Sequence, residues 1–208
     1  MQIARSVNEV AYENTYYIYN EEHVLIVDPG SDTATIFSAL EQIGKIPAAI
    51  LLTHTHYDHI LSVDKLREKY TNLPVYVHPL EADWLGDPMK NLSGLSHNAH
   101  MENLVIQPAD YFFEDEKSYS IGGMTFTVVE TPGHSAGSVS LIFKDFVVSG
   151  DAMFQNSIGR WDLPTGNQET LLNSCKTRLL VLPEEFKVYP GHGEPTTIGM
   201  EKEFNPFF

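Results

Sequence analysis

Four short apolar segments of this 208-residue chain end in the same way, with small or turn-forming residues followed by a histidine or an aspartate. One of them, Ile50–Leu52, leads into the cluster Thr53-His54-Thr55-His56-Tyr57-Asp58-His59. The other three, at 128–130, 146–148 and 187–189, lead to His134, Asp151 and His192. Sites in α/β proteins are built where the carboxyl ends of strands meet. The pattern therefore predicts strands that bring these side chains together.

The spacing within the first cluster suits a metal site. Residues two apart in extended backbone face the same way, so His54 and His56 can bind one ion. Asp58 and His59 stand at the predicted start of a helix, where the dipole favours a carboxylate and a neutral imidazole. Those are the protonation states that a metal requires. With the later strand ends, the donors are too many for one tetrahedral ion but suit two ions that share a carboxylate.

Composition narrows the classes of function. The chain has 28 Asp and Glu against 13 Lys and Arg, a net charge of −15, which disfavours a nucleic-acid groove. A single cysteine, Cys175, excludes an intramolecular disulfide, and it is expected to be a small core residue. The longest apolar run, Ile46–Leu52, is far shorter than a membrane span. We therefore expect a cytoplasmic protein, a monomer or homodimer, without a membrane or nucleic-acid partner.

Strand and helix patterns alternate along the chain, which predicts an α/β fold with sheets covered by helices. No linker or repeat interrupts residues 1–208, so we expect a single domain. We expect three helices. The first is capped by Ser31 or Asp32 and ends at Gly44, and the other two cover Asp58–Tyr70 and Gln168–Leu182. The expected strands are Gln2–Val7, Asn14–Asn20, His23–Val27, Ala48–Thr53, Val75–His78, Thr125–Glu130, Val139–Phe143, Phe146–Ser149 and Phe186–Tyr189.

These motifs together resemble the metallo-β-lactamase superfamily, whose signature His-x-His-x-Asp-His reads here as His54 to His59. The resemblance covers nearly the whole chain and implies an αββα sandwich with the site at one edge. It also implies two divalent ions, with zinc expected and iron or manganese as alternatives. The ligands carried over are His54, His56 and His134 for one ion, Asp58, His59 and His192 for the other, and Asp151 as the bridge beside a shared water.

Within the superfamily the chain is similar to short, single-domain glyoxalase II-like hydrolases. The stretches Gly150–Phe154, Ser157–Arg160 and Asp162–Pro164 carry this similarity, as does the tail from Thr196. The chain differs from the usual pattern at Leu61-Ser62 and at Trp161. Only residues 193–208 follow His192, so we expect no C-terminal helical domain and no inherited lactoylglutathione specificity. Retention of His59 disfavours hydrolysis of β-lactams.

The resemblance favours hydrolysis of a small thioester, in which Asp58 and Asp151 orient the attacking hydroxide. Thiols leave as thiolates without a dedicated acid, because their pKa lies near about 8.5. Two alternatives stay open, a persulfide dioxygenase with one iron and a non-enzymatic module braced by metal. Nucleases of this superfamily usually have basic surfaces, which the composition argues against.

Several residues near the motifs have two interpretations. Arg160 could bind a substrate carboxylate, or it could pair with Asp162 and hold its own loop, which we favour slightly. Tyr57 and Trp84 could line the pocket. The polar segment Glu81–Leu104 is a candidate lid. The remaining histidines are expected to be ordinary surface or core residues, and they are His23, His78, His97 and His100.

Overall fold

A computed structural model describes residues 1–95 and 102–208. By its internal contacts the chain divides into two compact units. The first unit contains Met1–Phe112 and Ser120–Met124, and the second contains Phe113–Tyr119 and Thr125–Phe208. Each is described by itself, and the expectation of a single domain stays a prediction.

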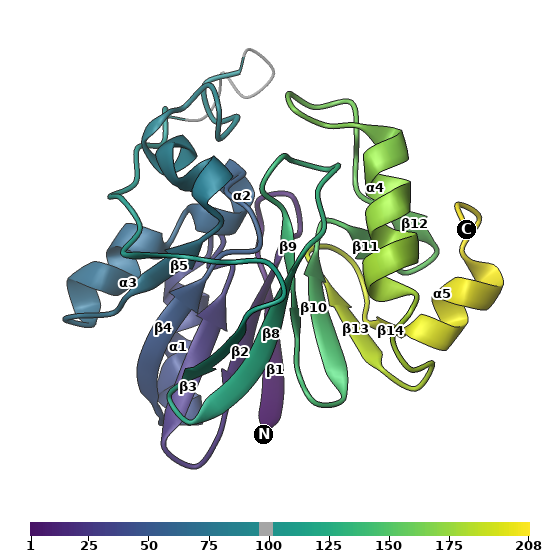
Figure 1. Ribbon diagram of the computed structural model, residues 1–208. Coiled ribbons are helices and arrows are strands. Elements are labelled where there is room, and N and C mark those ends of the chain that lie inside the picture. Colours follow the sequence, from purple (N-terminus) through teal and green to yellow (C-terminus); the bar gives the residue numbers. More distant parts are fainter. Residues whose placement is uncertain (96–101) are drawn as a thin grey trace. The chain divides into compact units, whose positions relative to one another are not determined.

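The first unit is built on a sheet with the order β1-β2-β3-β4-β5-β6. β1 and β2 are antiparallel, whereas β3, β4, β5 and β6 run parallel to one another, so their carboxyl ends lie at one edge. The elements are β1 (Gln2–Val7), β2 (Asn14–Tyr19), β3 (His23–Val27), α1 (Thr33–Ile43), β4 (Ile46–Leu51), α2 (Tyr57–Ile60), α3 (Val63–Lys69), β5 (Val75–Val77), the 3₁₀-helix η1 (Pro79–Gly86) and β6 (Tyr111–Phe112) (Figure 1).

Apolar side chains from helices and strands form the core of this unit. Ile36 and Leu40 of α1 pack in one cluster with Ile26 of β3 and Ile50 of β4. The helical spacing of Ile36 and Leu40 places both on the buried face of α1, as the sequence predicts. Gly44 ends this helix at φ 64°, a left-handed conformation that glycine adopts without strain.

The second unit is built on a sheet with the order β14-β13-β10-β9-β8-β7, together with a small hairpin of β11 and β12. Its elements are β7 (Ser118–Ile121), β8 (Met124–Glu130), β9 (Val139–Ile142), β10 (Phe146–Gly150), β11 (Met153–Phe154), β12 (Ser157–Ile158), α4 (Gln168–Ser174), the π-helix η3 (Cys175–Leu179), β13 (Lys187–Pro190), β14 (Thr196–Thr197) and α5 (Ile198–Phe204) (Figure 1).

Helices cover this second sheet through a separate core. Val147 of β10 and Val188 of β13 pack in one cluster with Leu171 of α4, Cys175 of η3 and Ile198 of α5. Cys175 is therefore a core residue, as expected. Burial raises the pKa of its thiol to about 12.

Two helix predictions need correction. The expected helix Asp58–Tyr70 is two helices, α2 and α3, because the Ser62 amide donates to the Pro29 carbonyl at 3.0 Å instead of continuing the helix. The Ser62 hydroxyl also donates to the Gly30 carbonyl at 2.5 Å. The expected helix Gln168–Leu182 changes at Cys175 from α to π and ends at Leu179.

The predicted side-chain cap of α1 is also wrong. Asp32 occupies the N-cap position but makes no capping hydrogen bond with its side chain. Its carboxylate instead accepts from the Glu9 amide at 3.1 Å, and the Ser31 hydroxyl accepts from the Val10 amide at 3.1 Å. Both side chains therefore hold the β1–β2 loop.

The candidate lid is only partly described. Its first part, from Glu81, belongs to η1, while residues 96–101 lie outside the described residues, and with them His97 and His100. His78 caps η1 by accepting from the Leu80 amide at 3.3 Å. No helix of residues 1–95 or 102–208 combines the length and apolar character needed to cross a bilayer.

Candidate metal centre

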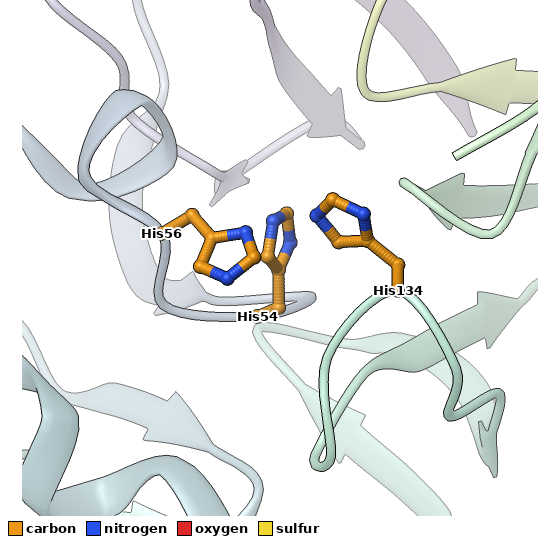
Figure 2. A group of neighbouring side chains, drawn as sticks. All are labelled: His54, His56 and His134. Carbon is orange, nitrogen blue, oxygen red and sulfur yellow. The ribbon is translucent and has the colours of Figure 1, made fainter. Parts of the chain in front are cut away.

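Four predicted ligands of the first unit lie on the segment that leaves the carboxyl end of β4. His56 has extended backbone at the N-cap of α2, and Figure 2 shows the imidazoles of His54 and His56 on this loop. Their ring centroids are 4.7 Å apart, and those of His54 and His59 are 4.1 Å apart. Asp58 and His59 lie within the first turn of α2, and His59 Nε2 is 3.7 Å from Asp58 Oδ2. All four side chains are buried, so the sequence cluster is also a spatial cluster.

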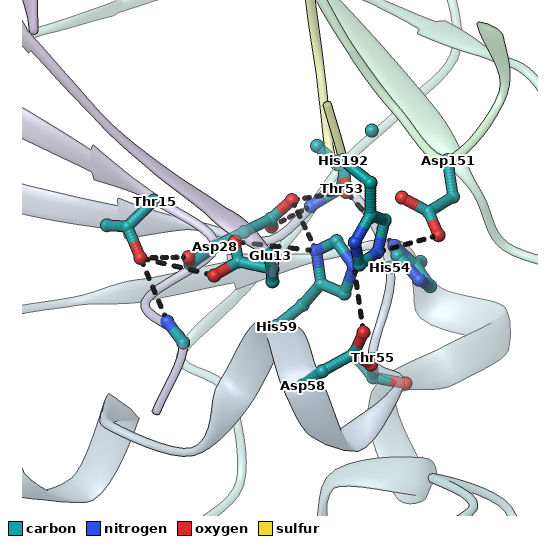
Figure 3. Close-up of polar contacts among 12 residues, drawn as sticks. Glu13, Thr15, Asp28, Thr53, His54, Thr55, Asp58, His59, Asp151 and His192 are labelled. Carbon is teal, nitrogen blue, oxygen red and sulfur yellow. Dashed lines mark hydrogen bonds and ion pairs between the residues drawn. The ribbon is translucent and has the colours of Figure 1, made fainter. Parts of the chain in front are cut away.

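A buried carboxylate orients two of these histidines. Asp28, at the carboxyl end of β3, lies 3.1 Å from His59 Nδ1 and accepts hydrogen bonds from the amide and hydroxyl of Thr53 at 2.7 and 2.6 Å (Figure 3). The Thr53 oxygen is in turn 3.1 Å from His54 Nδ1. Hydrogen bonds at Nδ1 fix the tautomer of a ligating histidine. The Nε2 atoms of His54 and His59 are therefore the nitrogens that suit a metal ion.

A second buried acid lies behind Asp28. Glu13 is 0% exposed, and its Oε1 is 3.8 Å from His59 Nδ1. Asn8 donates to its Oε2 at 2.6 Å and to the Thr15 hydroxyl at 2.9 Å, and that hydroxyl donates to the Asp28 carbonyl at 2.9 Å. The β1–β2 loop is thereby joined to the ligand cluster.

A third buried acid supports the backbone between His54 and His56. Glu81 of η1 is 0% exposed and accepts from the amide and the hydroxyl of Thr55 at 2.7 and 3.0 Å. Trp84, from the same helix, stacks on the His56 ring with 22° between the planes. Trp84 thus lies beside a predicted ligand, whereas the role of Tyr57 at the pocket stays a prediction.

The second unit brings its three predicted ligands together. β8, β10 and β13 all point the same way, because β10 is parallel to β13 and β9 is antiparallel to both β8 and β10. His134, Asp151 and His192 follow these strand ends. Asp151 Oδ2 lies 3.5 Å from His134 Nε2 and 3.3 Å from His192 Nε2.

These separations fit a metal ion. Ligand atoms about 2.0–2.1 Å from a tetrahedral zinc ion lie roughly 3.4 Å from each other. The nitrogens of His134 and His192 stand at 3.5 and 3.3 Å from the carboxylate oxygen, and Asp151 is 7% exposed. Imidazole and carboxylate donors suit zinc, iron or manganese alike. The donor set therefore fits a divalent ion without identifying it.

The loop that carries His134 is held by backbone contacts. Figure 2 shows the imidazole of His134 on this loop. Its Nδ1 lies 2.8 Å from the Arg160 carbonyl, so that nitrogen donates and Nε2 is the one suited to metal. Gly133 has φ 128°, and a Cβ there would be 2.3 Å from the Leu171 amide nitrogen. Only glycine allows α4 to approach this loop so closely.

Arg160 forms the ion pair that the sequence analysis slightly favoured. Its Nε and a terminal nitrogen donate to the two carboxylate oxygens of Asp162 at 2.9 and 3.1 Å. This contact raises the pKa of Arg160 and lowers that of Asp162. Both side chains are largely exposed, at 65 and 63%.

We predict that Arg160→Ala leaves KM within about twofold of wild type, because the Arg160 guanidinium pairs with Asp162 and holds its own loop. The melting temperature should also change little, because exposed ion pairs in water contribute little to stability. Steady-state kinetics and thermal melting check this prediction, with Lys176→Ala on the same unit as the control. A large rise in KM at unchanged melting temperature would assign Arg160 to substrate binding.

Sequence reasoning missed the supporting acids Asp28, Glu13 and Glu81. Asp28 carried a usable signal, since it follows the carboxyl end of β3 just as the predicted ligands follow their strands. The sequence Asp28-Pro29-Gly30 is typical of a turn, so Asp28 was interpreted as a turn residue and not as a partner of the predicted ligands. Glu13 and Glu81 stand in polar segments without a pattern that distinguishes them from exposed acids.

Comparison with known proteins identifies the family. A model described as "Metallo-beta-lactamase superfamily" matches residues 9–192. The chain is 48% identical over 210 residues to a "Probable metallo-hydrolase" of Streptococcus pyogenes serotype M6, covering 100% of this chain and 90% of that protein. It is 30% identical over 191 residues to a hydroxyacylglutathione hydrolase of Haemophilus influenzae, covering 90% and 88%.

Solved structures agree on the fold. The structure of BLEG-1 B3 metallo-beta-lactamase has a TM-score of 0.92 and 41% identity, and 99% of each chain is covered. That of TTHA1623 in a di-iron-bound form has a TM-score of 0.84 and 35% identity, with 99% and 100% covered. ETHE1 from Myxococcus xanthus has a TM-score of 0.77 and 27% identity, with 99% and 84% covered. The predicted α/β fold of the metallo-β-lactamase type is confirmed.

Proposed function

Because this chain belongs to the metallo-β-lactamase superfamily, we propose that it is a binuclear metallohydrolase that cleaves small thioesters. The family and the His and Asp clusters support the broader statement that it is a metal-dependent hydrolase. The observation that carries the proposal is the placement of His134 and His192 around one oxygen of Asp151, at separations that suit a tetrahedral ion.

The proposed ligand assignment follows the family motif. Each ion would have three donors of its own, and one carboxylate would be shared. The first set is His54, His56 and His134, the second set is Asp58, His59 and His192, and the shared carboxylate is Asp151.

In the proposed site, the ions and the residues around them have separate roles. When bound, the ions lower the pKa of water toward neutrality and polarise the substrate carbonyl. Asp58 and Asp151 orient the attacking water as well as contributing ligand oxygens. Asp28 keeps Nδ1 of His59 protonated, which assigns Nε2 to the metal.

A thioester suits this site because the leaving group needs no general acid. A thiol with a pKa of about 8.5 departs as the thiolate near neutral pH. The strong acid–base candidates of the cluster are assigned as metal ligands or hold those ligands in place. The similarity to a protein named hydroxyacylglutathione hydrolase supports the same substrate class.

Hydrolysis of β-lactams is a second candidate. The structure named B3 metallo-beta-lactamase shares 41% identity with this chain over almost its whole length. This similarity weighs against the sequence argument that disfavoured antibiotic hydrolysis. A ring amide leaves as an amine, which needs a proton, so a thioester remains the easier substrate for the residues present.

The test combines metal analysis with three assays on the purified protein. We expect about two divalent ions per chain and hydrolysis of a small thioester, for which lactoylglutathione is the probe, although specificity for it is not expected. One iron with oxygen consumption on glutathione persulfide would replace the proposal with a dioxygenase, and turnover of a chromogenic cephalosporin alone would favour the second candidate. A cytoplasmic location, a monomeric or homodimeric state and the lack of a nucleic-acid partner stay predictions.

A further inference from the structure

The β11–β12 hairpin lies between the proposed ligand Asp151 and Arg160, whose carbonyl contacts the proposed ligand His134. β11 starts at Met153, two residues after Asp151, and β12 ends at Ile158, two residues before Arg160. The Arg160 carbonyl is the 2.8 Å partner of His134 Nδ1. One short hairpin therefore joins a carboxylate ligand to the group that orients a histidine ligand.

The two ends of this hairpin are also packed against each other. The Gly159 amide donates to the Ala152 carbonyl at 3.4 Å. A Cβ on Gly159 would be 1.8 Å from the Asp151 carbonyl oxygen and 3.2 Å from His134 Nδ1. A displacement of the hairpin would thus move Asp151 and the Arg160 carbonyl together.

The turn of the hairpin is held by two residues at the C-terminal end of the chain. Glu201 of α5 is 0% exposed, and its Oε2 accepts from the Asn156 amide at 2.9 Å. Asn205, just beyond α5, donates to the Ser157 carbonyl at 3.0 Å and to Glu201 Oε2 at 2.7 Å. We call Glu201 and Asn205 the α5 clamp.

The clamp is fixed on its other side by the core and by β14. Glu201 Oε1 accepts from the Thr196 hydroxyl at 2.6 Å. Ile198 is 0% exposed and packs in the core of this unit. The Gly199 amide donates to the Glu184 carbonyl at 3.0 Å. Glu201 therefore connects β14 to the hairpin turn.

We propose that the α5 clamp is a positioning element for the metal centre, and that it sets metal affinity through the β11–β12 hairpin. Glu201 and Asn205 touch neither the proposed ions nor substrate. They hold the turn, and the turn fixes the geometry of Asp151 and of the carbonyl that orients His134. This inference rests on the proposed function, because it requires that these residues bind metal.

The test measures metal affinity of the full chain by competition between the metal-free protein and a chromophoric chelator for Co²⁺ or Zn²⁺. Outer partners of metal ligands typically contribute about 10- to 100-fold to affinity. We expect Glu201→Ala to weaken binding by roughly 10-fold or more. Glu201→Gln should restore it, because the amide oxygen can accept from Asn156 and Asn205 while its NH₂ donates to the Thr196 hydroxyl.

Two controls separate positioning from stability. Glu203→Ala removes an exposed acid of the same helix and should change neither affinity nor melting temperature. Ile198→Val removes a methyl group from the core side of α5, so it should lower the melting temperature and leave affinity unchanged. If Glu201→Ala does not fold, Asn205→Ala removes the contact to the Ser157 carbonyl and serves in its place.

The outcomes distinguish the two proposals. Wild-type protein that binds no divalent metal would remove the proposed function and this inference with it. Wild-type protein that binds metal, together with a folded Glu201→Ala or Asn205→Ala variant of equal affinity, would overturn the clamp alone. Weakened binding in Ile198→Val to the same extent as in Glu201→Ala would also overturn it, since stability would then explain the effect.

Discussion

Asp151→Ala is expected to lose bound metal and hydrolase activity together. The carboxylate oxygen of Asp151 stands 3.3 and 3.5 Å from the nitrogens of His192 and His134, so its removal takes the central donor from this cluster. Loss of an outer partner alone costs up to about 100-fold in affinity or activity. Loss of a ligand should therefore exceed about 100-fold in kcat/KM.

Metal content by elemental analysis and thioester turnover check this expectation. Asp145→Ala is the matched control, because this exposed aspartate precedes β10, whereas Asp151 follows the carboxyl end of the same strand. The control should keep both metal and activity. An Asp151→Ala protein with full metal content and full activity would contradict the shared-ligand assignment.

Gly159→Ala is the second change for which we expect a large effect. The added methyl group would be placed 1.8 Å from the backbone carbonyl oxygen of Asp151, a contact that no side-chain rotation relieves. Overpacking of a core typically costs about 1–3 kcal/mol, and a clash with backbone should reach or exceed the upper end. Because the hairpin must move, metal should be lost as well.

Urea unfolding of the metal-free protein measures the stability part of this prediction. Gly86→Ala is the control, since a Cβ there has nothing within 4 Å. Its free energy of unfolding should stay close to that of wild type. Equal unfolding midpoints for Gly159→Ala and wild type would show that the hairpin accommodates the methyl group.

The clustering of the second-unit candidate ligands was predictable from sequence because these residues follow a simple physical rule. Apolar strands are recognisable, and their carboxyl ends are marked by small or turn residues. Asp151 comes directly after its strand, and His134 and His192 follow within a few residues of theirs. In the second unit the strand directions then bring the three side chains together. Local pattern and strand direction were sufficient for this part.

The supporting network was not predictable in the same way. Glu13, Glu81 and Glu201 are fully buried, yet each stands in a polar or amphipathic segment where an acid is normally exposed. Their burial depends on partners far along the chain, such as Asn156 for Glu201. The break between α2 and α3 has a similar origin, because Ser62 bonds to the distant Pro29–Gly30 turn.

The burial of Cys175 has a practical consequence for labelling. Thiol reagents react with the thiolate, and a pKa raised to about 12 leaves almost none at neutral pH. The side chain is 0% exposed as well, and Cys175 is the one cysteine of the sequence. The native cysteine should therefore not react with thiol reagents, so a cysteine introduced at the surface would be labelled selectively with a fluorophore or spin label.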